Sequence, residues 1–169
     1  VSEPITLKSA ITFPLYRDHL TVIVYPGHPW TRRKEIAPND LFTEDFISRE
    51  IGSGTREVYL KALEAISKGK QLKSVMVLGN TESVKMAVMG KMGFSIVSRL
   101  ATRPEVELGL LKEVRIKNVR MTRDFFVVFK SEQNLSVPAL KLKAHLKEKK
   151  RELDSNHVQP PALQVHRRR

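Results

Sequence analysis

The chain has 169 residues, of which 41% are hydrophobic and 28% are charged, and its formal net charge at pH 7 is +12. This length is enough for one domain with a sizeable core or for two small lobes. The absence of cysteine excludes disulfides, thiolate metal sites and cysteine nucleophiles. No apolar run is long enough to cross a membrane, so we expect a soluble protein with no membrane partner, and the absence of cysteine fits a cytoplasmic one.

The positive charge is concentrated near the C-terminus. Nine lysines or arginines stand against three acidic residues from Leu140 to Arg169, an excess of six. A basic tail of this kind is more typical of a solvated extension than of a specific binding surface. The body shows no zinc-finger, basic-zipper or RNA-motif signature. We therefore expect any DNA binding by this chain to be weak and independent of sequence.

The first half of the chain predicts one buried strand and one amphipathic helix. The β-branched run His19–Tyr25 reads as a buried strand that the following Pro26-Gly27 pair stops. A single helical turn is expected at residues 38–41 and a short strand at residues 45–48. Apolar residues then recur with a helical period over residues 55–67, and a glycine follows where a C-terminal cap belongs.

The second half alternates strands and helices. We expect strands at residues 75–78, 94–97 and 122–129, helices at 81–89 and 137–146, a short helix at 98–101 and an edge segment near 110–114. Asn80 or Thr81 would cap one helix, and Ser136 followed by Pro138 would start the last one. The alternation predicts βαβ units and a largely parallel sheet flanked by helices, and therefore an α/β fold.

Two turns combine glycine with hydroxyl-bearing residues where a strand turns into a helix. They are Gly52-Ser-Gly-Thr-Arg-Glu57 and Leu78-Gly-Asn-Thr-Glu-Ser-Val84. A helix N-terminus leaves backbone N–H groups unpaired and carries a partial positive charge, and small residues let an anion approach closely. Ligands of parallel sheets bind beyond the carboxyl ends of the strands. Two such turns in one α/β unit therefore predict a ligand site.

Four segments follow one another in a fixed order: YPGHPW, ISREIGSGTRE, VLGNTESVKMAVMGKMGFSIVSRLA and MTRDFFVVFKSEQNLSVPALKLKAHL. In this order and spacing they resemble the effector-binding domain of LysR-type transcriptional regulators, from about His19 to Leu146. The resemblance implies two α/β lobes of the periplasmic-binding-protein kind, joined by two crossing strands. On this likeness Leu20–Tyr25 and Phe125–Phe129 would be the crossings.

The resemblance also implies a division of the chain. Residues 1–30 would hold a remnant of the first lobe and the first crossing strand, 31–121 the second lobe, 122–150 the return crossing strand and the C-terminal helix of the first lobe, and 151–169 a disordered basic tail. The family's winged helix-turn-helix and much of its first lobe have no counterpart here. A truncated or proteolysed product would explain the missing part of the first lobe. We expect DNA contacts only through the absent N-terminal domain.

The turns and the resemblance together predict a small-molecule site at Ser53, Gly54, Thr55, Asn80, Thr81, Ser98, Gly27 and His28. A purely structural alternative exists, because Ser53, Asn80 and Ser98 could serve only as helix caps. His28 could be a turn residue, since no partner carboxylate is apparent. Arg56 could pair with an anionic ligand or lie on the exposed face of its helix.

No catalytic residue, metal or cofactor is expected. The five histidines lack metal-ligand spacing, no phosphate-binding loop occurs, and Ser53 has no identifiable base. The leading hypothesis is an effector-binding regulatory domain, not an enzyme, that binds a small polar or anionic metabolite between its lobes and self-associates. The alternative is a solute-binding protein of the same fold family with no DNA link, and a third option is an enzyme on this scaffold.

Overall fold

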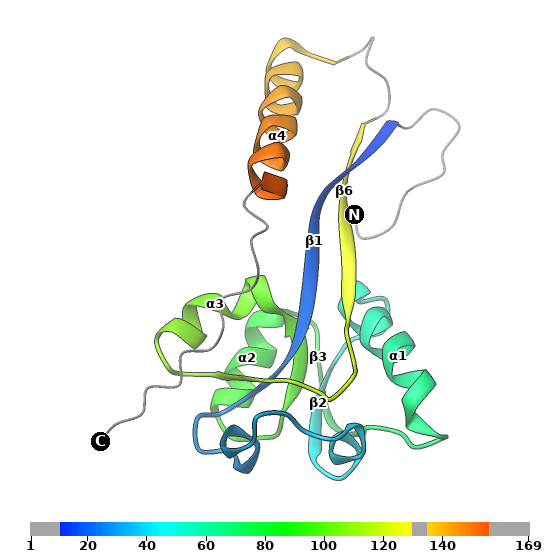
Figure 1. Cartoon of the computed structure of the whole chain (residues 1–169), viewed down its shortest axis with the longest axis vertical. Helices are drawn as coiled ribbons and strands as arrows, with labels where there is room; N and C mark the ends of the chain where they lie inside the picture. Colours follow the sequence, from blue (N-terminus) through cyan, green and yellow to red (C-terminus); the bar gives the residue numbers. More distant parts are fainter. Residues whose placement is uncertain (1–10, 130–134, 156–169) are drawn as a thin grey trace. The chain divides into compact units, whose positions relative to one another are not determined.

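A computed structural model describes the backbone of residues 11–129 and 135–155, and the side chains as far as residue 150. The chain forms two compact units, one of residues 17–123 and one of the residues before and after it. Two strands, β1 (Ile11–Val24) and β6 (Thr122–Phe129), contribute to both units (Figure 1). The chain enters the unit of residues 17–123 at Arg17 and leaves it after Arg123. Of the segment 1–30, expected to hold the remnant of the first lobe and the first crossing strand, residues 1–10 lie outside the described part.

Parallel and antiparallel strands combine in the unit of residues 17–123. β2 (Asp45–Arg49) pairs in parallel with β3 (Lys73–Leu78), and a parallel bridge from Phe46 to Phe94 leads to β4 (Ser95–Ser98). β1 runs antiparallel to β4 and to β5 (Lys112–Val114), and it also pairs with β6. The parallel pairing expected for the middle of the chain is therefore present, and the crossing strand joins it in the opposite direction.

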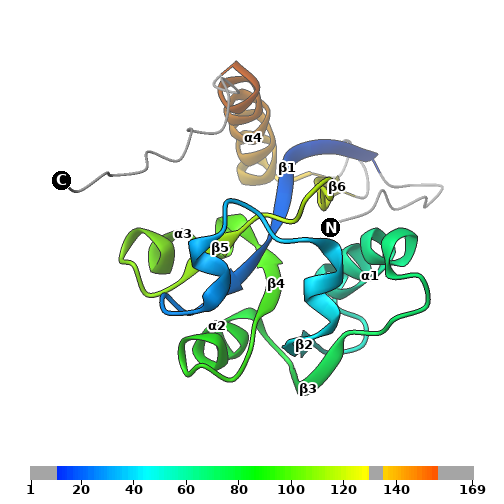
Figure 2. The same cartoon turned by 60° about the horizontal axis from the view of Figure 1, so that its bottom comes forward.

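Helices cover both faces of these strands, and side-chain alternation along each strand explains why. Leu20, Val22 and Val24 of β1 pack with Tyr59 and Leu63 of α1 (Gly54–Ser67). The alternate strand residues form a second core with α2 (Thr81–Met89) and α3 (Arg99–Glu107): it contains Ile23, Ile47, Val84, Val88, Val97 and Leu111. Figure 2 shows α1 on one side of the strands and α2 and α3 on the other.

Most of the expected elements are confirmed, and two helices are longer than predicted. The helix expected to end at residue 101 continues to Glu107. It accommodates Pro104, whose backbone oxygen accepts a 3.0 Å hydrogen bond from the N–H of Leu108. A 3-10 helix at Pro38–Phe42 confirms the expected helical turn, and another spans Pro29–Arg32.

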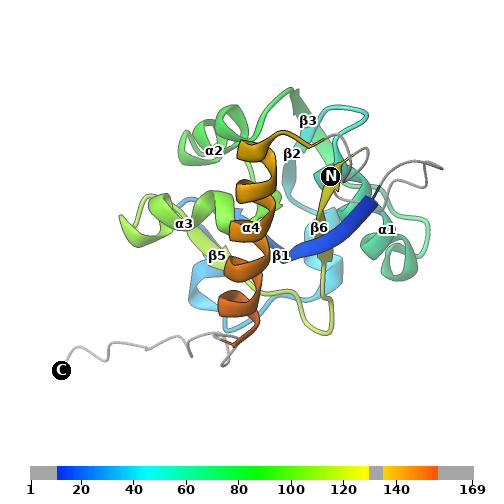
Figure 3. The ribbon, with the colours of Figure 1, turned by 90° about the horizontal axis from the view of Figure 1, so that it is seen from above.

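The other unit contains α4 (Val137–Ser155), which Figure 3 shows as one continuous helix. The predicted helix ended at residue 146, but no glycine or proline follows before Pro160, and lysine, glutamate, arginine and leucine sustain a helix. Residues 151–155, expected to be disordered, are thus helical, whereas residues 156–169 lie outside the described part. Lys143 and Lys147 of α4 lie over the rings of Phe129 and Phe13 at 4.8 and 5.7 Å.

Candidate functional site

The first predicted turn forms the start of α1. Gly52 has a φ of 86°, a backbone conformation that favours glycine, and it turns the chain from β2 into the helix. Ser53 is the N-cap, and its Oγ accepts a long hydrogen bond of 3.5 Å from the backbone N–H of Arg56. Ser53 and Thr55 are each only 6% exposed, and Gly54 between them is partly exposed. The first backbone N–H groups of α1 have no partner within the helix, and they lie in a partly buried turn.

The second predicted turn forms the start of α2. Asn80 is exposed and caps the helix, with its Oδ1 accepting a 2.8 Å hydrogen bond from the N–H of Ser83. Thr81 is the first helical residue, and its hydroxyl accepts a 2.9 Å hydrogen bond from Nη1 of Arg49. This contact joins the start of α2 to the end of the neighbouring strand β2.

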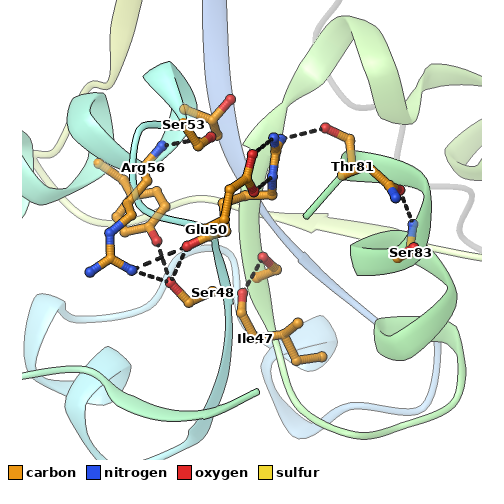
Figure 4. Close-up of polar contacts among 12 residues, drawn as sticks. Ile47, Ser48, Glu50, Ser53, Arg56, Thr81 and Ser83 are labelled. Atoms are coloured by element: carbon orange, nitrogen blue, oxygen red, sulfur yellow. Dashed lines mark hydrogen bonds and ion pairs between the residues drawn. The ribbon is translucent and has the colours of Figure 1, made fainter. Parts of the chain in front are cut away.

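An ion pair lies between the two turns. The Nε and Nη2 atoms of Arg49 each donate a 2.7 Å hydrogen bond to one carboxylate oxygen of Glu50, which makes the contact bidentate. These hydrogen bonds lower the pKa of Glu50 to about 2, because they stabilise its charged form. Figure 4 shows Glu50 between Ser53 and Thr81. The carboxyl end of β2 thus places one cation and one anion beside two helix N-termini.

Arg56 has a structural partner rather than a free, exposed position. Its Nη1 donates to Oγ of Ser48 at 2.9 Å and to the backbone oxygen of Arg49 at 3.1 Å (Figure 4). Ser48 is buried and also shares a 2.8 Å hydrogen bond with the hydroxyl of Tyr59. Arg56 therefore ties the first turn of α1 to β2 and holds the turn at Ser53 in place.

Ser98, at the end of β4, belongs to a polar network. Although it occupies the N-cap position of α3, its side chain does not cap that helix; its Oγ donates instead to Oδ1 of Asp18 at 2.8 Å. The other oxygen of Asp18 accepts from Nε of Arg123 at 3.0 Å, and Nη1 of Arg123 donates to Oγ1 of Thr55 at 3.1 Å. This network joins both crossing strands to the starts of α1 and α3.

Gly27 and His28 lie at the opposite end of β1. In the antiparallel pairing with β4, Leu20 stands beside Ser98 and Ile23 beside Ser95, so the chain moves away from Ser98 as it approaches Gly27. The distance along the strand from Leu20 to its end is about 13 Å at the usual rise per residue. The structure therefore brings six of the eight predicted residues to one edge and leaves these two at the other.

His28 has a local structural role. Its Nδ1 accepts a 3.2 Å hydrogen bond from the backbone N–H of Trp30, and its ring makes edge contacts with Tyr25 and Trp30. Burial lowers the pKa of His28, because the charged imidazolium loses its hydration. The geometry is that of a neutral turn residue, in agreement with the structural alternative.

Sequence reasoning missed four residues of this edge: Asp18, Arg49, Glu50 and Arg123. The motif around Gly52 contains the adjacent Arg49 and Glu50, and a charged pair directly after a buried strand was an available signal. For Asp18 the signal was weaker: an acidic residue shortly before a buried apolar run. Among the described residues no group of three or more potential ligands could hold a metal ion, and no helix is both long and apolar enough to cross a membrane.

Comparison with known proteins agrees with this architecture. The family model of the LysR substrate binding domain matches residues 1–151. A "Probable RuBisCO transcriptional regulator" of Phaeodactylum tricornutum is 30% identical over 154 residues, which are 90% of this chain and 50% of the relative. The RuBisCO operon transcriptional regulator of Acidithiobacillus ferrooxidans is 33% identical over 69% of this chain and 37% of its own length.

A solved structure is similar over nearly the whole chain. The regulatory domain of CcmR from Synechocystis PCC6803, in complex with 2-PG, has a TM-score of 0.80 and 27% sequence identity. The match covers 90% of this chain and 73% of that domain. The chain spans only 50% and 37% of the two curated relatives named above. Fold, family model and relatives agree, and the chain belongs to the LysR substrate-binding domain family.

Proposed function

We propose that the chain is the effector-binding part of a LysR-type transcriptional regulator and that it binds a small anion at the edge formed by the starts of α1 and α2. One observation carries the proposal: the turns at Ser53–Thr55 and Asn80–Thr81 flank the guanidinium of Arg49 at the carboxyl ends of parallel strands. Backbone N–H groups at helix starts and a planar guanidinium all favour a carboxylate or a phosphate.

The relatives support this choice of ligand class. Two of them are named as regulators of RuBisCO genes, and the CcmR regulatory domain was solved with 2-PG. They make 2-PG the first compound to test and inorganic phosphate the second. The alternative of a solute-binding protein with no DNA link receives no support from these relatives, because both curated ones are transcriptional regulators.

The binding event acts as a signal and not as a reaction. The edge holds helix starts, one ion pair and a buried Asp–Arg network, whereas a hydrolase or transferase needs a nucleophile beside a base. An effector changes the regulator only through different affinities for two of its states. We propose that the whole regulator works in the cytoplasm, self-associates and contacts DNA outside the residues described here.

Calorimetric titration tests the site. Thr55→Ala and Thr81→Ala should each weaken binding of 2-PG or inorganic phosphate by about 1 kcal/mol, a typical net value for one hydrogen bond. The matched control is Thr43→Ala, because the exposed Thr43 bonds only the backbone oxygen of Asp40 in its own turn. Unchanged affinity in both site variants, with binding intact in the control, would remove the assignment.

A further inference from the structure

The ion pair between Arg49 and Glu50 occupies the groups that an anionic ligand would need. All three guanidinium nitrogens of Arg49 donate: Nε and Nη2 to Glu50, and Nη1 to Thr81. The edge of the guanidinium formed by Nε and Nη2 matches one carboxylate or one phosphate at a time. Glu50 therefore takes up the same two donors that a carboxylate or phosphate ligand would use.

The two partners differ in their freedom to move. The side chain of Arg49 is 14% exposed and is also held by Thr81, whereas the side chain of Glu50 is 37% exposed. The backbone of Glu50 is fixed, because its N–H donates to the oxygen of Leu78 and its own oxygen accepts from the N–H of Ser53. Only the side chain of Glu50 can leave, and it can do so into solvent without disturbing either helix start.

We propose that Arg49 is an anion-binding residue of the effector site and that Glu50 is its internal competitor, which an effector carboxylate or phosphate displaces from the guanidinium. This inference rests on the proposed function and adds the group that sets its affinity. Glu50 holds the guanidinium in the binding orientation while no effector is present. It also weakens binding of every simple anion, so only a ligand with further contacts to the helix starts competes well.

Glutamate substitutions separate this competition from a purely structural ion pair. Glu50→Gln removes the charge and keeps the size of the side chain, and Glu50→Ala removes the side chain altogether. Both should bind inorganic phosphate and 2-PG more tightly, by about fivefold or more, because the internal anion no longer competes. Arg49→Gln should lose most of the affinity. The control is Glu57→Gln, which removes one acidic residue from the first turn of α1 and should change affinity little.

A spectroscopic readout follows the guanidinium itself. In the wild-type chain, the Nε–H resonance of Arg49 should move during a phosphate titration, since phosphate replaces the Glu50 carboxylate as its partner. In Glu50→Gln the resonance should already be shifted before phosphate is added. A merely structural role for the pair predicts lower thermal stability in Glu50→Gln with no gain in affinity.

The outcomes separate this inference from the proposed function. If Glu50→Gln and Glu50→Ala bind phosphate no more tightly than wild type while Thr81→Ala still weakens binding, the site stands and the competition is wrong. If neither Arg49→Gln nor Thr81→Ala affects binding, the proposed site itself is wrong. Tighter binding in both Glu50 variants, with Glu57→Gln unchanged, supports the competition.

Discussion

Nε of Arg123 lies 3.0 Å from Oδ2 of Asp18, and this contact joins the two crossing strands where each enters the unit of residues 17–123. The side chain of Asp18 is 1% exposed and that of Arg123 is 12% exposed. Burying a carboxylate is costly unless its oxygens are paired, and here Ser98 and Arg123 pair one oxygen each. The pair therefore fixes the relation between β1, β6 and the starts of two helices.

Replacing the buried carboxylate should destabilise this unit. Asp18→Asn keeps the shape but removes the charge that balances Arg123, and we expect a loss of roughly 2–4 kcal/mol in the free energy of unfolding. The measurement is chemical denaturation followed by circular dichroism. The control is Glu107→Gln, which breaks an exposed i,i+4 pair with Arg103 and should have little effect. Equal effects of the two substitutions would show that burial of Asp18 is not decisive.

Gly93 has a conformation and a neighbour that exclude other residues. Its φ is +144°, and a Cβ placed there would overlap the backbone oxygen of Asp45. Gly93→Ala should cost roughly 2–4 kcal/mol of stability, because it adds backbone strain and a clash between the start of β4 and β2. Gly79→Ala is the matched control, since its added Cβ would meet no atom within 4 Å. A stability of Gly93→Ala close to that of Gly79→Ala would contradict the close approach.

The buried imidazole of His28 predicts a pH dependence of stability. Its pKa is lower in the folded state than the ordinary value of 6.5, because burial disfavours the charged form. The folded state therefore binds this proton less readily than the unfolded state, and stability is complete above pH 6.5 and falls as the pH drops below it. His28→Asn keeps a cap acceptor that does not titrate and should flatten this part of the profile. Identical slopes for wild type and variant between pH 7 and 5 would refute the role of His28.

Local signals made much of the fold predictable. The bounds of α2, Thr81–Met89, agree with the sequence because a capping residue, a helical period and a following glycine all lie within a short stretch. The same signals located the starts of α1 and α2, where five of the predicted site residues lie. α4 ends at Ser155, nine residues after the predicted end at residue 146. No helix-breaking residue lies between these two positions, so no local signal marks an end at 146.

Contacts between distant residues were not predictable. Asp18 and Arg123 are separated by 105 positions, and only the pairing of β1 with β6 brings them together. Gly27 and His28 were predicted to be site residues because they lie at the first expected crossing strand. The antiparallel direction of β1 puts the end of that strand at the far edge, and a single sequence does not reveal strand direction.

We expect an anion to bind at the starts of α1 and α2. Backbone amide resonances of the isotope-labelled chain, followed during titration with 2-PG and with inorganic phosphate at constant ionic strength, test it most directly. A chloride titration over the same range controls for general salt effects. We expect the largest saturable shifts at the amides of Gly54, Thr55, Thr81 and Glu82. Saturable shifts confined to the turn at Gly27 and His28 or to α4, with those four amides unmoved, would contradict it.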